Sequence, residues 1–305
     1  MSCADFSNLI KNISESIDEW ERLKYIPKEG WKLLGENNLI GISFNQENGV
    51  SKLADAISQL TVLKKAGLLS AFAINEISFR LLSLFRTQID TSIMEEIASG
   101  NKNISLCITE EKAGSDLGAI ESEAVLEDGH YNFKGKKILI SNGPIADYFI
   151  LAIKTNKDVA AWRGITLFLL DKEDVGSKIS EPIPAVGAHL MPLGAMELDG
   201  IRVSEDKILG KKNRGFEYLM NILLFERVVI SILATAMCED ILKTFIKYLN
   251  EREIFGKKLK DYQNTKFVVA EMFSRTKVLR NFVDKLIHDY DKNDVDKSNV
   301  MISKV

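Results

Sequence analysis

The sequence predicts an α+β protein of several domains. An all-α N-terminal domain is expected over residues 1–100, an antiparallel β-sandwich or barrel over 101–210, and a C-terminal helical bundle over 211–305. The spacing of hydrophobic residues supports this division. It is typical of helices at both ends of the chain, and from about residue 103 it gives way to short β-rich runs. The length of 305 residues agrees, since one domain usually has about 100–200 residues.

The N-terminal domain is predicted from apolar residues that recur at spacings of three and four. Pro27 is expected to start a short helix, because proline suits the first turn, and a loop follows at Gly41 and Gly49. The apolar faces of the next two helices are Leu53, Ile57, Leu60 and Leu63, and then Ile74, Ile77, Leu81 and Leu84.

The middle domain is predicted from strand and turn signals. Glu127-Asp128-Gly129 lies between two short runs and indicates a hairpin. No long helix separates the runs, which favours antiparallel pairing, and neither GxGxxG nor GxxxxGK[ST] occurs, which disfavours a Rossmann or P-loop site. The expected strands are Glu123–Leu126, His130–Lys134, Lys137–Ile140, Tyr148–Lys154, Ile165–Leu170 and Met196–Val203.

The C-terminal region is predicted to hold a long helix after Gly215, a second from about Asp261 and a third from about Asp296. The most apolar stretch, 221–238, contains Glu226 and Arg227, so it is interpreted as a buried helix and not as a membrane span. One face of the long helix is predicted to consist of Phe216, Leu219, Leu223, Arg227, Ile230, Ala234, Met237, Ile241, Phe245 and Tyr248, and an incomplete bundle would leave its apolar stripe exposed.

The composition of the chain excludes some classes of function. Forty basic against 43 acidic residues exclude a nucleic-acid-binding domain as the main role, and the basic cluster at 207–214 is interpreted as a solvated loop. Cys3, Cys107 and Cys238 form no disulfide or metal-ligand pattern, so no metal is expected. No signal peptide is evident, and a cytoplasmic location is predicted.

Several motifs follow one another in a fixed order. They are Thr109-Glu110-Glu111-Lys112-Ala113-Gly114-Ser115-Asp116, Tyr131 to Lys136, Ile140-Ser141-Asn142-Gly143, Ala146-Asp147, Glu226-Arg227, and Arg252 to Lys257 with Gln263. Taken singly, the first is an ordinary loop. Together they resemble the acyl-CoA dehydrogenase family over essentially the whole chain.

The resemblance implies the three-domain fold and FAD bound between the β domain and the C-terminal bundle. It implies that Ile108, Thr109 and Ser141 contact the flavin ring and that Gly114 and Ser115 line the approach to the pyrophosphate and the acyl thioester. Leu139 replaces the tryptophan that usually flanks the flavin. Arg252, Phe255 and Gln263 are expected to reach the FAD of a neighbouring subunit, so a homodimer or homotetramer is implied.

The implied reaction is α,β-dehydrogenation of an acyl thioester, with the electrons passed to an electron-acceptor protein. A glutamate takes the α-proton and flavin N5 takes the β-hydride; a base of this kind needs a raised pKa. Glu226 stands where a minority of the family carries this base, and a surface carboxylate or ion-pair partner is the alternative. Ser115 and Arg227 are the expected substrate contacts.

The chain reaches Val305 before the segment resembling Y-E-G-T that holds the base in most members, so the last bundle is expected to be incomplete. A shortened chain, a partner that supplies the remaining helices and a degenerate member are three explanations. Two other functions stay open: a dehydrogenase of a biosynthetic pathway that acts on an acyl group held by a carrier protein, and a non-catalytic, partner-dependent subunit.

Overall fold

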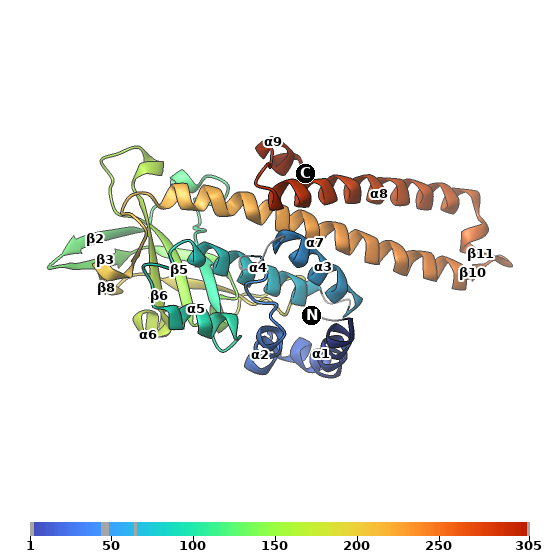
Figure 1. The fold of residues 1–305 in the computed structure, drawn as a ribbon, viewed down its shortest axis with the longest axis horizontal. Helices are drawn as coiled ribbons and strands as arrows, with labels where there is room; N and C mark the ends of the chain where they lie inside the picture. The colour runs from blue at the N-terminus through green and yellow to red at the C-terminus, as the bar shows by residue number, and fades with distance from the viewer. Residues whose placement is uncertain (1–2, 44–48, 64–65, 304–305) are drawn as a thin grey trace.

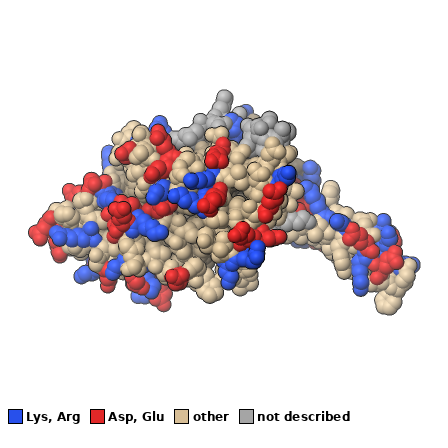
Figure 2. All heavy atoms as spheres, turned by 90° about the horizontal axis from the view of Figure 1, so that it is seen from below, with Lys and Arg blue, Asp and Glu red and all other residues tan. Residues whose placement is uncertain are grey.

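The protein is described by a computed structural model that covers residues 3–43, 49–63 and 66–303. A group of helices, a β domain and a long helical hairpin follow one another along the chain, and the hairpin projects away from the β domain (Figure 1). On the face in Figure 2, basic and acidic side chains are interspersed along the body and at the tip of the hairpin.

Three of the N-terminal helices, α2, α3 and α4, lie where the sequence predicted helices. Pro27 precedes α2 as expected, and α3 and α4 carry the two predicted apolar faces. Leu63 and Leu84 are exceptions, because they lie beyond the ends of α3 and α4; the Leu84 side chain is 52% exposed. The helices are α1 (Cys3–Leu23), α2 (Lys28–Glu36), α3 (Gly49–Leu60), α4 (Ala66–Ser83) and α5 (Thr91–Ala98).

The β domain contains two sheets that face each other across an aromatic-rich core, with Tyr131 and Phe133 packed edge-on against Phe168. The larger sheet has the order β8-β3-β2-β5-β6-β9, with β1 beside β5, and the smaller sheet pairs β4 with β7. The strands are β1 (Ile104–Cys107), β2 (Glu123–Glu127), β3 (His130–Lys134), β4 (Lys136–Ser141), β5 (Tyr148–Lys154), β6 (Ile165–Asp171), β7 (Leu193–Glu197), β8 (Arg202–Ser204) and β9 (Ile208–Leu209).

Two details of the β domain differ from the prediction. The run Met196–Val203 is two strands of different sheets, β7 and β8, separated by a turn in which Gly200 has a φ of 85°. The pairing is also not antiparallel throughout, because β1 runs parallel to β5. The hairpin at Asp128-Gly129 is as predicted; both residues have positive φ, as a tight two-residue turn requires.

The C-terminal region consists of α7 (Gly215–Glu251), the short hairpin β10 (Glu253–Ile254) and β11 (Lys257–Lys258), α8 (Gln263–Asp291) and α9 (Lys297–Ser303). By length and composition α7 could span a membrane, yet half of its most apolar window is buried within this chain. The start of α7 lies along the β domain, its middle packs on α4, and its far half pairs with α8 (Figure 1).

The buried face of α7 is rotated from the predicted apolar face. Leu219 of that face is buried, but Ile241 and Tyr248 are more than half exposed. The helix carries apolar residues on most of its surface, so its sequence period alone could not select the side that packs. The buried apolar residues are Leu219, Ile222, Phe225, Val228, Val229, Ile232, Ala236, Leu242 and Leu249.

Candidate functional site

Six of the predicted cofactor residues lie along one border of the β domain, which we call the β4 edge: Ile108, Thr109, Gly114, Ser115, Leu139 and Ser141. Ile108 and Thr109 directly follow β1, and Leu139 and Ser141 belong to β4. The backbone N–H of Ile138 donates to the carbonyl of Thr109 at 2.9 Å, which joins the two segments. Gly114 and Ser115 follow the tight turn 110–113, which begins one residue beyond Thr109.

The β4 edge presents polar groups that are free to bind. Among the described residues, the hydroxyls of Thr109, Ser115 and Ser141 have no hydrogen-bond partner, and Leu139 is 51% exposed. A Cβ added to Gly114 would meet nothing within 4 Å, so the space beside this glycine is open. Unpaired hydroxyls next to an exposed apolar side chain suit a flat aromatic ring with a polar rim, so these residues fit a flavin.

A β-bulge produces this arrangement. The register of β4 against β7 shifts between Lys137 and Ile140, and Leu139 has a φ of 53°, a left-handed value that is rare for a branched side chain. Asn142, also left-handed, turns the chain after β4 and donates from Nδ2 to the carbonyl of Ala71 on α4 at 3.1 Å. These contacts tie the end of the β4 edge to the N-terminal helices.

A buried ion pair lies beneath the β4 edge, and the sequence analysis missed it. Lys137 Nζ is 2.6 Å from Glu110 Oε1, and the lysine side chain is fully buried. Burial lowers the pKa of Lys137. At Glu110 burial is the largest single effect and raises the pKa, but the charge of Lys137 and the hydrogen bonds from Lys137, Ser122 and Glu121 together outweigh it, so the pKa of that carboxyl is lowered. A lysine at the start of the apolar strand Lys137–Ile140 is the signal that could have revealed the pair.

Cys107 lies next to this pair, and its thiol is unreactive. It is buried with a free thiol, and burial raises its pKa to about 12 despite the nearby charge of Lys137. The thiol is therefore protonated at neutral pH and is not a nucleophile.

Glu226 and Arg227 lie on α7, about 16 Å along the helix from its start at Gly215. Both side chains are partly buried. Within the described part of the chain the Glu226 carboxylate has no hydrogen bond or ion pair, so it is not an ion-pair partner here. One turn further along, Ser231 Oγ donates to Ser303 Oγ on α9 at 2.8 Å.

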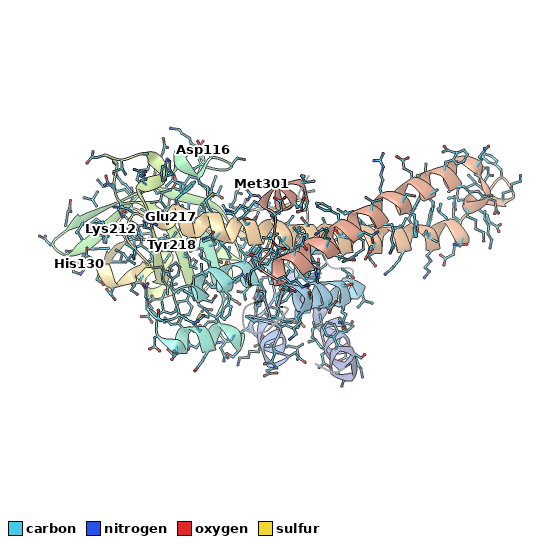
Figure 3. The ribbon with its side chains drawn as sticks, turned by 45° about the horizontal axis from the view of Figure 1, so that its top comes forward. Asp116, His130, Lys212, Glu217, Tyr218 and Met301 are labelled. Carbon is cyan, nitrogen blue, oxygen red and sulfur yellow. The ribbon has the colours of Figure 1, made fainter. Side chains whose placement is uncertain are left out.

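The first half of α7, which carries Glu226, contacts the β domain and α9. Figure 3 shows Lys212, Glu217 and Tyr218 near the beginning of α7, with Asp116 on the β domain and Met301 on α9 on one side of that helix. Along α7, Glu226 lies between the start at Gly215, where the helix packs along the β domain, and Ser231, which contacts α9.

The other three predicted cofactor residues lie elsewhere. Arg252, Phe255 and Gln263 are exposed at the tip of the α7–α8 hairpin, and Phe255 is 96% exposed with a φ of 48°. In Figure 1 this tip and the β domain are at opposite ends of the molecule. One copy of the chain therefore does not bring these residues to its own β4 edge.

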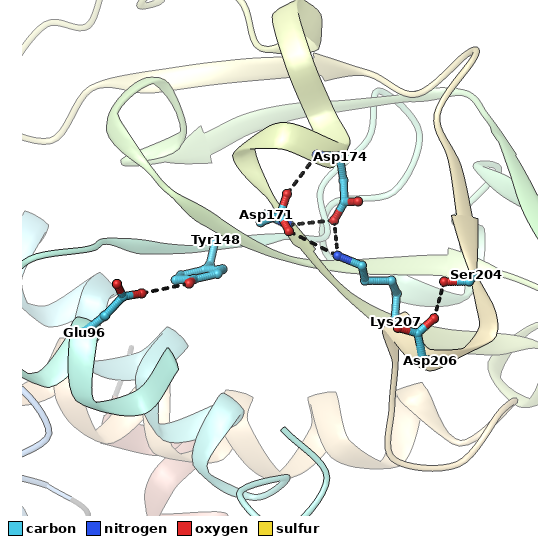
Figure 4. A network of polar contacts seen from close by, with 7 residues as sticks. All are labelled: Glu96, Tyr148, Asp171, Asp174, Ser204, Asp206 and Lys207. Carbon is cyan, nitrogen blue, oxygen red and sulfur yellow. Dashed lines mark hydrogen bonds and ion pairs between the residues drawn. The ribbon is translucent and has the colours of Figure 1, made fainter. Parts of the chain in front are cut away.

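The surface has hollows away from the β4 edge. One of about 300 Å³ lies between α7 and α8, and one of about 280 Å³ lies beside Tyr148 and Lys207. In the second, Lys207 pairs with Asp171 and Asp174, and Tyr148 donates to Glu96 (Figure 4). Burial, followed by the bond to Glu96, raises the pKa of Tyr148 to about 12. These groups satisfy one another, which indicates a structural role.

Side chains of the basic cluster at 207–214 also have partners within this chain. Lys207 is paired as described, Arg214 pairs with Glu217, and Lys212 lies 5.1 Å from the centre of the Tyr131 ring. Lys211, Lys212 and Arg214 are exposed, as expected of a solvated loop, whereas Lys207 is partly buried and pairs with a distant segment.

Two family patterns match the chain. The pattern described as "Acyl-CoA dehydrogenase, middle domain" matches residues 105–201, and "Acyl-CoA dehydrogenase, C-terminal domain" matches residues 213–305. Together they cover more than half of the chain, including the β4 edge, Glu226 and the hairpin tip.

The chain belongs to the acyl-CoA dehydrogenase family.

Relatives in this family have different acyl carriers. The chain is 25% identical to the mitochondrial long-chain specific acyl-CoA dehydrogenase of Rattus norvegicus, over 94% of this chain and 68% of that protein. It is 27% identical to the L-prolyl-[peptidyl-carrier protein] dehydrogenase of Pseudomonas fluorescens, over 93% of this chain and 77% of that protein. The fold matches an acyl-CoA dehydrogenase from Geobacillus kaustophilus with a TM-score of 0.90 at 24% identity, over all of this chain and 83% of that one.

Membership of the family identifies the cofactor and the type of reaction. Acyl-CoA dehydrogenases are flavoprotein oxidoreductases that bind FAD and act on CH–CH groups. They work with acyl substrates and with electron-transferring flavoproteins. The resemblance inferred from the motifs, the FAD cofactor and the enzyme class are therefore confirmed.

Proposed function

We propose that the protein catalyses FAD-dependent α,β-dehydrogenation of an acyl thioester, with Glu226 as the base that removes the α-proton. The observation that carries this proposal is the partial burial of the Glu226 side chain on α7 together with the lack of a hydrogen bond or ion pair for its carboxylate among the described residues. An unpaired carboxylate in such a position is a candidate base.

The residues of this chain have separate tasks in the proposal. The hydroxyls of Thr109 and Ser141 hold the polar rim of the flavin, and Leu139 covers part of its ring. FAD, when bound, supplies the acceptor for the β-hydride. Ser115 and Arg227 contact the substrate, and Glu226 holds the proton taken from the α-carbon.

The hairpin tip points to a second subunit. Arg252, Phe255 and Gln263 are exposed and far from the β4 edge of their own chain, as expected of residues that serve the FAD of a neighbour. We therefore propose at least a homodimer. The division at residues 100 and 210 and the cytoplasmic location stay predictions.

The first experiment follows the visible flavin absorbance of the purified full chain with FAD while acyl-CoA is added. Glu226→Gln should bind FAD as the wild type does and slow the substrate-dependent loss of absorbance by about 10²–10⁴-fold, because it cannot accept the proton. Glu217→Gln is the matched control, because Glu217 lies on the same helix and pairs with Arg214 at the surface. Turnover by Glu226→Gln at the wild-type rate would rule out this role.

A second candidate function is dehydrogenation of an acyl group on a carrier protein. It is favoured by the similarity to the L-prolyl-[peptidyl-carrier protein] dehydrogenase, which extends over 93% of this chain. Parallel additions of acyl-CoA and of prolyl-loaded peptidyl-carrier protein separate the two. Loss of flavin absorbance with the carrier protein alone would support this second function. If neither substrate acts, the chain is a non-catalytic subunit or needs a partner.

A further inference from the structure

Lys137 makes an unusual number of contacts for a lysine inside a β-strand. Its side chain has no exposed surface, and Nζ lies 2.6 Å from Glu110 Oε1, 2.6 Å from the carbonyl of Ala152 and 3.3 Å from the carbonyl of Ile108. An ammonium group has three protons, and here each has an acceptor. The lysine thus joins β4, β5 and the segment after β1.

Glu110 extends the same network to the far side of the turn. Its carboxylate accepts from the backbone N–H of Glu121 at 2.7 Å and of Ser122 at 3.1 Å. Its backbone exchanges hydrogen bonds with Ala113 at 3.0 and 3.2 Å and so closes the turn that precedes Gly114 and Ser115. One ion pair therefore reaches both segments of the β4 edge.

The β-bulge determines which side chains of β4 face inward. In a regular strand, residues two apart share a face, so Leu139 would point inward with Lys137. Instead Lys137 and Ile140 are both buried and Leu139 is half exposed. The bulge thus exposes Leu139, while Lys137, which precedes it, stays buried.

We propose that Lys137 is a positioning residue: through Glu110, Ile108 and Ala152 it holds the β4 edge in its binding geometry before the flavin arrives. The inference rests on the proposed function, because it assigns the β4 edge to the flavin. A buried ion pair contributes little net stability compared with apolar side chains of similar size. Its directional contacts are suited to fixing the relative positions of segments, as a preorganised site requires.

The first test needs no cofactor. Hydrogen exchange of the full chain without FAD is compared between the wild type, Lys137→Met and Lys136→Met. Lys136 is the matched control, since it lies one residue earlier on β4 and makes only an exposed pair with Glu197. We expect the amides of residues 108–116 and of Ile138 to exchange about tenfold faster in Lys137→Met and to be unchanged in Lys136→Met.

The second variant covers the case in which Lys137→Met leaves the buried charge of Glu110 without an opposite charge and the chain fails to fold. Lys137→Met/Glu110→Gln removes both charges and keeps an acceptor for Glu121 and Ser122. It should fold with wild-type circular dichroism, yet show the same local increase in exchange. It should also bind FAD about tenfold more weakly and have a shifted visible absorption band at saturating FAD.

The possible results distinguish a failure of the positioning role from a failure of the proposed function. Wild-type exchange at 108–116 and Ile138 in both Lys137 variants would overturn the positioning role. Wild-type FAD affinity and absorption band in the double variant would overturn it as well. If the wild-type chain binds no FAD, the proposed function fails, and the exchange comparison still decides whether Lys137 holds the β4 edge.

Discussion

Glu76 on α4 is a fully buried carboxylate outside the proposed site. It accepts from the backbone N–H groups of Gly41 and Ser43 and from the Ser43 hydroxyl, while Arg80 donates to the Ser43 carbonyl at 2.6 Å. Burial raises its pKa from 4.5 to about 7, although these hydrogen bonds and Arg80 act in the opposite direction. The folded protein therefore binds this proton more tightly than the unfolded chain.

This pKa predicts a pH dependence of stability. The contribution of Glu76 is fully present below about pH 4.5 and is lost as the pH rises through about 7, a change of about 3 kcal/mol in the free energy of unfolding. Glu76→Gln cannot ionise, so its stability relative to the wild type should rise by about this amount between pH 5 and 8. Urea unfolding at a series of pH values measures it.

The control for this measurement is Glu271→Gln, which alters only an exposed pair with Arg275. A difference between Glu76→Gln and the wild type that stays constant with pH would contradict the prediction.

At the scale of elements, the start of α3 is capped by a residue from α8. Asp291 accepts from the backbone N–H groups of Val50 at 2.9 Å and Ser51 at 3.0 Å, and also from the Ser51 hydroxyl. A carboxylate at a helix N-terminus satisfies free N–H groups and interacts favourably with the helix dipole. This contact joins the N-terminal helices to the C-terminal hairpin.

Asp291→Ala should lower the free energy of unfolding by about 1–2 kcal/mol, because two N–H groups lose their acceptor. Asp289→Ala is the matched control: Asp289 lies two residues earlier and pairs with Lys285 one turn away, a contact worth about 0.5 kcal/mol. Denaturant unfolding compares the two. Equal losses would show that the cap contributes no more than the helix pair.

At the scale of the whole molecule, the α7–α8 hairpin carries apolar side chains that this chain does not cover. Phe267, Phe273 and Val278 on α8 are 64%, 56% and 70% exposed, and Ile241 on α7 is 56% exposed. Exposed apolar groups gathered on one element are typical of a protein interface. Together with the exposed tip, they predict that the chain self-associates through this hairpin.

Sedimentation velocity of the full chain over a range of concentrations tests the association. Phe273→Glu/Val278→Glu should shift the population toward monomer, because buried charges without partners oppose association. Val186→Glu is the control, since Val186 is fully exposed on a loop of the β domain. A wild-type chain that stays monomeric, or an equal effect of the control, would contradict the hairpin interface.

The positions of α2, α3, α4 and the three C-terminal helices, most strands and the family could be predicted from the sequence. Helical and strand periods are local, so α2, β5 and the turn at Asp128-Gly129 could be predicted from neighbouring residues alone. The motifs containing Thr109, Ser141 and Glu226 are also local, and they identified the candidate site residues. The cofactor and enzyme class followed from the family.

Which side of each element packs against the rest of the chain could be seen only in the folded structure. The buried face of α7, the parallel pairing of β1 with β5 and the Asp291 cap each depend on residues distant in sequence. The bulge at Leu139 is of this kind, because the network around Lys137 and Glu110 that accompanies it draws on β1, β4 and β5 at once. The local sequence pattern does not predict such contacts, because they stabilise the fold only when segments distant in sequence lie together.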